Sequence, residues 1–192
     1  MSQHYHIEQE VEKALPVLQK GGTILYPTDT IWGIGCDATQ EDAVKKIYRI
    51  KQRQDSKSLI TLVDSIDMLR DYLTLLPPGT EALMAQAKRP LTIIYPDAKG
   101  LAPNVISPDG SAAIRVVRHP FCQALVRALG KPLVSTSANL SGQPSPMSYG
   151  EIHPAILVGV DYVINLPSGL EDTKPSTIIK IDALGQQTLI RP

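Results

Sequence analysis

The sequence contains little that would tie a chain together covalently or hold it in a membrane. Only two of its 192 residues are cysteines, Cys36 and Cys122, and they form no C-x-x-C pair. A single disulfide between them is an open alternative, but a reduced cytosolic chain fits this cysteine usage better. The sequence has no uninterrupted apolar run of 18 residues and no signal-peptide pattern, so we expect a cytoplasmic protein with no membrane partner.

Charge of either sign is not in excess, because 19 lysines and arginines balance 19 aspartates and glutamates. A module that binds duplex nucleic acid usually carries a large positive excess, since neutralising phosphates drives its affinity. Any contact with RNA would therefore be a local patch, and the balance favours a small-molecule site. The four histidines show no H-E-x-x-H or comparable spacing, so a structural zinc is not expected; they are His4, His6, His119 and His153.

The common nucleotide and hydrolase motifs are absent as well. The sequence contains no G-x-x-x-x-G-K-[ST], no G-x-G-x-x-G and no G-x-S-x-G. Cations and hydroxyls on loops that follow strands remain. This inventory suits binding a triphosphate and stabilising charge at phosphorus better than it suits acid–base or covalent catalysis.

Helical and strand patterns interleave along a chain that is long enough for one core, and we expect a single domain over residues 1–192. Helices are expected at 8–20, 39–51, 65–73, 80–87, 119–129 and 149–156, and strands at 23–26, 59–63, 90–95, 112–117, 132–134, 161–164, 176–180 and 188–190. Thr39 and Ser65 are the expected N-caps of the second and third helices. The last strands follow one another without long helices between them. This order indicates an open, twisted, mixed α/β sheet and not a doubly wound parallel one.

Positive charge is concentrated at residues 51–59, between an amphipathic helix and an apolar strand. Lys51, Arg53 and Lys57 lie in this short polar run, which we interpret as a polyphosphate grip. The alternative is a solvated helix end, where cations offset the helix dipole without any function. If Lys51 and Arg53 act together, the helix should end here, because residues two apart point to different sides of a helix.

Three further segments carry groups suited to a ligand. Residues 28–35 combine hydroxyls, a carboxylate and two glycines, which is typical of a loop that lets a ligand approach the backbone. Arg115 lies within the apolar strand at 112–117, where its charge requires either a salt bridge or a ligand anion. Residues 135–139 place three hydroxyls and an amide directly after a buried strand, a usual position for ligands in α/β sheets, although polar turns give similar runs.

Taken together, these motifs resemble the YrdC/TsaC family of L-threonylcarbamoyladenylate synthases. The resemblance rests on Lys51-x-Arg53, Ser137-x-Asn139, residues 21–35 and residues 135–142, and it runs from about residue 8 to the end of the chain. It implies an open twisted α/β sheet flanked by helices around a large central cavity, as in the YrdC/RibB-like fold. It also implies a nucleotidyltransferase that joins L-threonine, bicarbonate and ATP into threonylcarbamoyl-AMP and releases pyrophosphate. A separate threonylcarbamoyl transferase complex would then act on adenosine 37 of tRNA, so contact with tRNA would be indirect.

The resemblance also implies roles for individual residues. The ATP-binding set would be Lys51, Arg53, Lys57, Ser111, Ser137, Asn139, Ser145 and Arg191, with Lys51, Arg53, Ser137 and Asn139 as the catalytic group. The threonine-binding set would be Thr30, Arg115, Ser135 and Ser176, with Arg115 pairing with the substrate carboxylate. Mg²⁺ would be held by the ATP phosphates, with no metal ligand from protein side chains.

The chain departs from the usual family pattern at four positions. Asp29 stands where Glu is common, Trp32 where Tyr is common, and Gln54 and Ser58 where Pro is frequent. It also resembles the short form that lacks an extra C-terminal domain. The YciO-like branch of the fold tends to differ at the Lys-x-Arg and Ser-x-Asn pairs, and both pairs are present here. The synthase is therefore favoured over two alternatives: a double-stranded RNA or tRNA-binding module, and a YciO-like paralogue that binds ATP without efficient synthesis.

Overall fold

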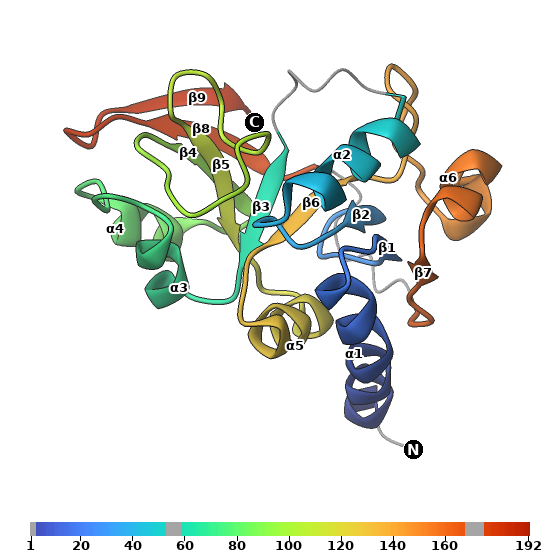
Figure 1. Cartoon of the computed structure of the whole chain (residues 1–192). Helices are drawn as coiled ribbons and strands as arrows, with labels where there is room; N and C mark the ends of the chain where they lie inside the picture. Colours follow the sequence, from blue (N-terminus) through green and yellow to red (C-terminus); the bar gives the residue numbers. More distant parts are fainter. Residues whose placement is uncertain (1–2, 53–58, 168–174) are drawn as a thin grey trace.

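The fold is given by a computed structural model, which describes residues 3–52, 59–167 and 175–192. Its centre is a nine-stranded sheet with the strand order β7-β1-β2-β6-β3-β5-β4-β8-β9 (Figure 1). The strands are β1 (Ile24–Tyr26), β2 (Gly33–Gly35), β3 (Ile60–Val63), β4 (Leu91–Tyr95), β5 (Ala112–Val116), β6 (Leu133–Ser137), β7 (Tyr162–Val163), β8 (Thr177–Ile181) and β9 (Gln187–Arg191). The helices are α1 (Gln3–Gln19), α2 (Glu41–Ile50), α3 (Ile66–Asp71), α4 (Thr80–Gln86), α5 (Pro120–Leu129), the 3-10 helix η1 (Tyr149–Glu151) and α6 (Pro154–Gly159).

The sheet is mixed, as the sequence predicts. The pairs β1–β7, β3–β5 and β4–β8 are parallel, whereas β1–β2, β2–β6, β3–β6, β4–β5 and β8–β9 are antiparallel. Strands far apart in the sequence become neighbours in this order, so side chains from all parts of the chain meet on one sheet. None of the helices in the part of the chain that the structure describes is long and apolar enough to cross a membrane.

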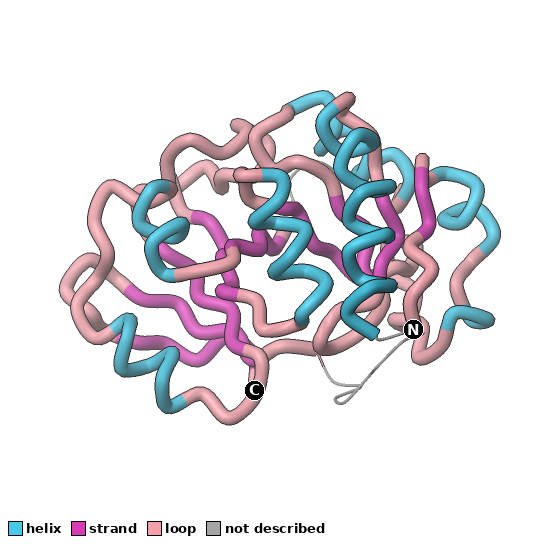
Figure 2. The backbone as a smooth tube through the Cα atoms, turned by 90° about the horizontal axis from the view of Figure 1, so that it is seen from below, coloured by secondary structure: helices cyan, strands magenta, loops and turns pink. Residues whose placement is uncertain are grey.

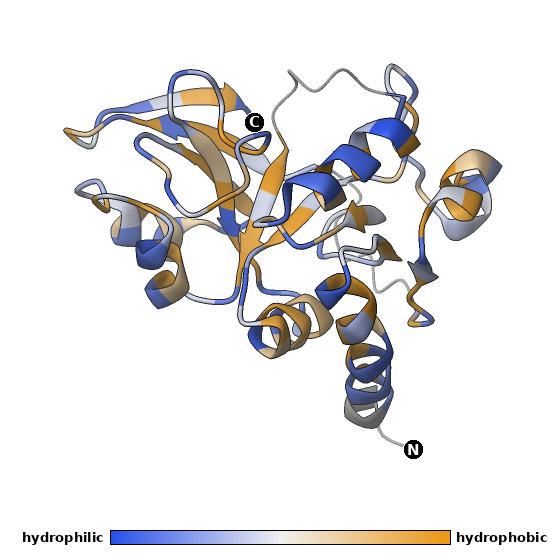
Figure 3. Cartoon of the chain, viewed as in Figure 1, coloured by the Kyte–Doolittle hydropathy of each residue, from blue (hydrophilic) through white to orange (hydrophobic). Residues whose placement is uncertain are grey.

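Each face of the sheet packs against its own set of helices, because side chains alternate between the faces along a strand. On one face, Tyr26 and Leu62 pack with Leu18 of α1 and Phe121 of α5, and Figures 1 and 2 both show these two helices side by side. On the other face, Leu25, Ile34 and Val134 share a core with α2. The ribbon of α2 is coloured mostly as hydrophilic in Figure 3. The helices α1 and α5 therefore cover part of the sheet face that carries Tyr26 and Leu62, and a ligand site on this face must lie where they do not cover it.

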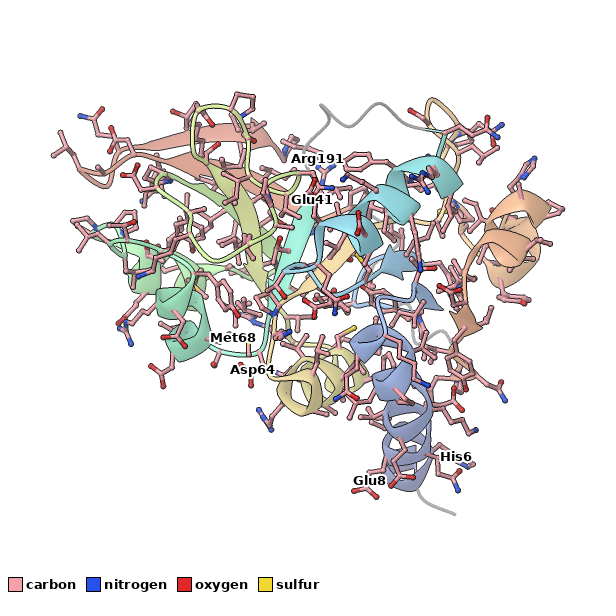
Figure 4. All side chains as sticks on the ribbon, viewed as in Figure 1. His6, Glu8, Glu41, Asp64, Met68 and Arg191 are labelled. Atoms are coloured by element: carbon pink, nitrogen blue, oxygen red, sulfur yellow. The ribbon has the colours of Figure 1, made fainter. Side chains whose placement is uncertain are left out.

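Of the two N-caps predicted from the sequence, one is confirmed and the other is wrong. Ser65 is the predicted N-cap of α3: its Oγ accepts a hydrogen bond from the Met68 amide at 3.1 Å and donates one to Asp64, next to α3 in Figure 4. The prediction that Thr39 caps α2 is wrong, because the N-cap is Gln40 and the Thr39 hydroxyl donates to Asp37 instead. The expected helix at 149–156 is also interrupted: η1 ends at Glu151, and α6 begins only at Pro154.

Two predicted loops contain strand residues. The glycine-containing segment at 28–35 ends in β2, and a Cβ added at Gly35 would lie 2.5 Å from the Val134 carbonyl oxygen and 2.8 Å from the Tyr26 ring. Glycine is required there because the neighbouring strand lies too close for any side chain. Likewise, β6 continues through Ser137, so Ser135 and Ser137 extend from a strand and not from the loop after it. Strand geometry aims these two serines to the same face.

The N-terminal helix is tied to the edge of the sheet by Glu10, which is buried although it is charged. Its carboxylate accepts hydrogen bonds from Lys13 at 2.8 Å, from the Tyr162 hydroxyl at 2.9 Å and from the Asn165 amide at 2.8 Å. Burial by itself raises the pKa of Glu10, but the bonds from Lys13, Asn165 and Tyr162 outweigh it and hold the pKa below its ordinary value.

We expect Glu10→Gln to lower the free energy of unfolding at pH 7 by about 1–3 kcal/mol, because an uncharged amide replaces an acceptor of three hydrogen bonds. A depressed pKa stabilises the fold above the carboxyl's unfolded-state pKa, and this contribution is lost as the pH falls through the folded-state value. The difference between wild type and variant, measured by urea unfolding, should therefore shrink below about pH 4. Glu12→Gln, an exposed change on the same helix, is the control and should have no such effect.

Candidate active site

A row of residues, most of them polar, crosses the face of the sheet that α1 and α5 partly cover. Residues opposite one another on paired strands point to the same face, so the register identifies the row. It consists of Gly33 on β2, Ser137 and Ser135 on β6, Ile60 on β3, Arg115 on β5, Thr92 on β4, Ile178 on β8 and Arg191 on β9. A single surface therefore carries residues that are separated by more than a hundred positions in the sequence.

A pocket of about 220 Å³ lies over this row. Seven of the residues implicated from the sequence line it: Thr30, Arg115, Ser135, Ser137, Ser145, Ser176 and Arg191. The volume lies below the roughly 300–1,000 Å³ typical of pockets for drug-sized ligands. The part of the cavity enclosed by described residues thus suits a small polar molecule, such as an amino acid, more than a whole nucleotide.

Arg115 is the buried charge of the pocket, with 4% of its surface exposed. Its Nη2 lies 3.4 Å from Oδ1 of Asp29, and within the described residues its Nε has no hydrogen-bond partner. A guanidinium has five N–H donors in a fork that matches a carboxylate. The sequence left open whether Arg115 pairs with a protein carboxylate or with a ligand anion. Both can hold at once, because Asp29 uses only part of the donor capacity of Arg115.

A second guanidinium, that of Arg191, reaches the same pocket from the end of β9, where Figure 4 labels it. Its Nε and Nη2 donate to the Ser176 carbonyl oxygen at 3.1 and 2.9 Å, and Nη2 also lies 3.4 Å from the Ser176 hydroxyl. Burial, and then the nearby charge of Arg115, lower the pKa of Arg191. Because arginine remains protonated even so, the two guanidiniums make this pocket attractive to anions.

Thr30 is placed on the pocket wall by Thr28, a residue that the sequence did not single out. The Thr28 hydroxyl accepts hydrogen bonds from the amides of Thr30 at 3.1 Å and Ile31 at 3.3 Å, and it donates to the Ile31 carbonyl at 2.7 Å. It also lies 3.1 Å from the Thr30 hydroxyl. A threonine that bonds to amides two and three residues ahead is a local turn signal, so this role could have been inferred from Thr-x-Thr-Ile.

Lys51 is buried and is not one of the residues that line the pocket. It forms the C-cap of α2, is 2% exposed, and its Nζ donates to the carbonyl oxygens of Ser137 and, at 2.7 Å, of Asn139. The Ser141 amide in turn donates to the Lys51 carbonyl at 2.9 Å. The end of α2, as predicted, coincides with Lys51, and the lysine fixes the turn that carries Ser137 and Asn139. Its predicted contact with ATP phosphates stays a prediction, and Arg53 and Lys57 lie outside the described residues.

Comparison with known proteins decides the family. A family model described as "Telomere recombination", which covers Sua5, YciO and YrdC proteins, matches residues 16–192. The chain belongs to this family. A threonylcarbamoyl-AMP synthase from Xanthomonas campestris is 36% identical over 182 residues, which cover 89% of this chain and 97% of the relative. The resemblance drawn from the motifs is thereby confirmed.

Solved structures of Sua5/YciO/YrdC proteins share the fold. The P. abyssi Sua5 structure complexed with L-threonine has a TM-score of 0.80 and 26% identity; it covers 95% of this chain, which spans 53% of that Sua5 chain. E. coli YciO has a TM-score of 0.81 and 26% identity, with 99% of this chain and 89% of that chain covered. Both branches considered from the sequence thus have the same architecture, and fold alone does not separate them.

Besides Lys51, two further described residues carried over from the family do not line the pocket. Asn139 donates from Nδ2 to the carbonyls of Leu140 at 2.9 Å and Gln143 at 2.7 Å, while its buried Oδ1 has no hydrogen-bond partner within the described residues. Ser111 shares a sheet face with Arg115 at the start of β5, but its hydroxyl donates to Asp109 at 2.6 Å. The Asn139 amide therefore holds its own turn and the Ser111 hydroxyl binds Asp109, and the predicted contacts of both residues with ATP stay predictions.

The metal prediction concerns Mg²⁺ delivered with ATP. Within the described residues there is no group of three His, Cys, Asp or Glu side chains that could hold a metal ion. The charges on the pocket wall, Arg115 and Arg191, are positive and do not attract a free cation. These residues fit a Mg²⁺ ion that is held by the phosphates of a nucleotide and not by protein side chains.

Proposed function

We propose that this protein synthesises L-threonylcarbamoyl-AMP from L-threonine, bicarbonate and ATP, with release of pyrophosphate. One observation carries the proposal beyond family membership: two guanidiniums and several hydroxyls line one small pocket, and the buried Arg115 retains donors for an anion. The name of the X. campestris relative and the L-threonine complex of P. abyssi Sua5 support the same reading.

In this proposal the amino acid occupies the described pocket. Its carboxylate pairs with Arg115, and the hydroxyls of Thr30, Ser135 and Ser176 surround its polar groups. The nucleotide lies on the side of the pocket that Ser137 and Ser145 line and extends beyond it toward Lys51. Arg191 lies between the two substrates at the end of β9. Separate subsites of this kind would hold the reacting groups together and reduce the entropic barrier.

The proposed chemistry has two bond-forming steps. The threonine amine attacks the bicarbonate carbon, water leaves, and a carbamate forms; a carbamate oxygen then attacks the α-phosphorus, and pyrophosphate leaves. Hydroxyl donors and guanidiniums stabilise the negative charge that develops on the phosphoryl oxygens. Mg²⁺ bound to the ATP phosphates would supply further charge neutralisation. The product would pass to a separate complex that modifies tRNA, so we also propose a cytoplasmic location.

The decisive experiment is pyrophosphate release by the purified protein in the presence of ATP, bicarbonate and Mg²⁺. We expect release that depends on L-threonine and on bicarbonate, with much less release for L-serine and none without an amino acid. Detection of threonylcarbamoyl-AMP by mass spectrometry identifies the product. Binding of ATP without release would instead indicate a YciO-like paralogue. Salt-dependent RNA binding that ATP does not compete away would indicate the RNA-binding alternative.

A further inference from the structure

Thr92 is a fully buried residue whose hydroxyl group lies next to a residue of the pocket wall, and the proposed reaction gives it no role so far. It lies on β4 and is 0% exposed. Its Oγ1 lies 2.8 Å from Oγ of Ser176, which lines the pocket and is itself 2% exposed. Valine, which has nearly the same shape as threonine, is also an ordinary residue at a buried strand position. A threonine at this position therefore calls for an explanation in terms of its hydroxyl.

The donors and acceptors around Ser176 restrict which way this hydrogen bond runs. Arg191 donates only, and its Nη2 lies 3.4 Å from the Ser176 hydroxyl oxygen. If Ser176 donated its single proton to Thr92, it would have none for a ligand, and within the described residues the Thr92 proton would have no recorded acceptor. If Thr92 donates, Ser176 accepts from Thr92 and Arg191 and keeps its own proton. In this second arrangement the proton left for a ligand belongs to Ser176, which lines the pocket, and not to the enclosed Thr92.

We infer that Thr92 is a positioning residue that fixes the Ser176 hydroxyl as a donor toward a carboxylate oxygen of the amino acid substrate. This inference rests on the proposed function. Arg115 and Ser176 line the same pocket from β5 and from the start of β8, and β4 runs between these two strands. A carboxylate that pairs with Arg115 thus has a second, neutral donor on the other side of β4. Thr92 acts through Ser176 and does not line the pocket.

The test compares Thr92→Val, which keeps the shape and removes the hydroxyl, with Thr92→Ser, which keeps the hydroxyl. We expect Thr92→Val to weaken L-threonine about 10-fold or more in both KM and Kd, because a ligand-facing donor is no longer held in place. The KM for ATP should change by less than about twofold, and Thr92→Ser should stay within about threefold of wild type. Trp32 is the single tryptophan and lines the pocket, so its fluorescence gives the Kd without turnover.

A double-mutant cycle separates positioning from a general loss of packing. In an Ser176→Ala background, Thr92→Val should weaken threonine no further, because the hydroxyl that it orients is already gone. An equal loss in both backgrounds, or an equal effect on ATP and threonine, would overturn the inference. So would unchanged threonine binding by Thr92→Val. If wild type binds no threonine at all, the proposed function fails together with it, and this result is distinct from the other three.

Discussion

Arg115→Ala is expected to lower kcat/KM for L-threonine by about 100-fold or more, because truncating one member of a buried charge pair typically costs about 2–5 kcal/mol. Arg115 is buried and binds Asp29 with only part of its donor capacity. The loss should appear mainly in threonine binding, with the Kd for ATP changed by less than about threefold. Steady-state pyrophosphate release and titration of Trp32 fluorescence measure the two quantities separately.

The variant needs controls because Arg115→Ala also leaves the Asp29 carboxylate without its partner, which can destabilise the fold. Arg115→Lys keeps the positive charge but loses the two-pronged fork, and we expect it to retain folding while still weakening threonine about 10-fold or more. Arg118→Ala is the matched control. Arg118 is exposed, lies just after the same strand and donates to the carbonyls of Met84 and Ala87, outside the pocket. Equal losses for threonine and ATP in a folded Arg115 variant would contradict the assignment.

The sequence was most informative where a residue type does not match the segment around it. Arg115 was identifiable because a charge within an apolar strand needs a partner, and the structure provides one in Asp29 while leaving donors over. The end of α2 at Lys51 was predicted because Lys51 and Arg53, two residues apart, would point to different sides of a continuing helix. Thr92, in contrast, gives no signal, because threonine is an ordinary strand residue and only its position beside Ser176 makes its hydroxyl informative.

The arrangement of the strands explains most of what the sequence could not supply. Whether Ser135 and Ser137 belong to a loop or a strand depends on pairing with β2 and β3, which come from distant parts of the chain. The expectation that Lys51 contacts phosphates came from its charge and from the family resemblance, and it stays a prediction. Its bonds to the Ser137 and Asn139 carbonyls join segments that are far apart in the sequence. Local composition predicts which groups are present. The register of the sheet determines which of them face the same pocket.

The position of Lys51 leads to the second large expected effect. Lys51→Met replaces a buried ammonium with an apolar side chain of similar length, so the carbonyls of Ser137 and Asn139 lose their donor. We expect kcat for pyrophosphate release to fall about 100-fold or more, as for loss of a preorganised donor group, because the Ser137–Asn139 turn is no longer held against α2. The Kd for L-threonine should change by less than about threefold, since the Arg115 side of the pocket is untouched.

Lys46→Met provides the matched control for this prediction. Lys46 lies on the same helix and also donates from Nζ to a backbone carbonyl, that of Gly21 at 2.9 Å, but it does not line the pocket. Lys46 is exposed and makes a single bond of this kind, whereas Lys51 is buried and makes two, so Lys46→Met should lower the thermal stability less than Lys51→Met. Only Lys51→Met should lose activity. Near-native turnover in folded Lys51→Met would show that neither its charge nor its hold on the turn is needed, whereas a parallel loss in Lys46→Met would attribute the effect to α2 as a whole.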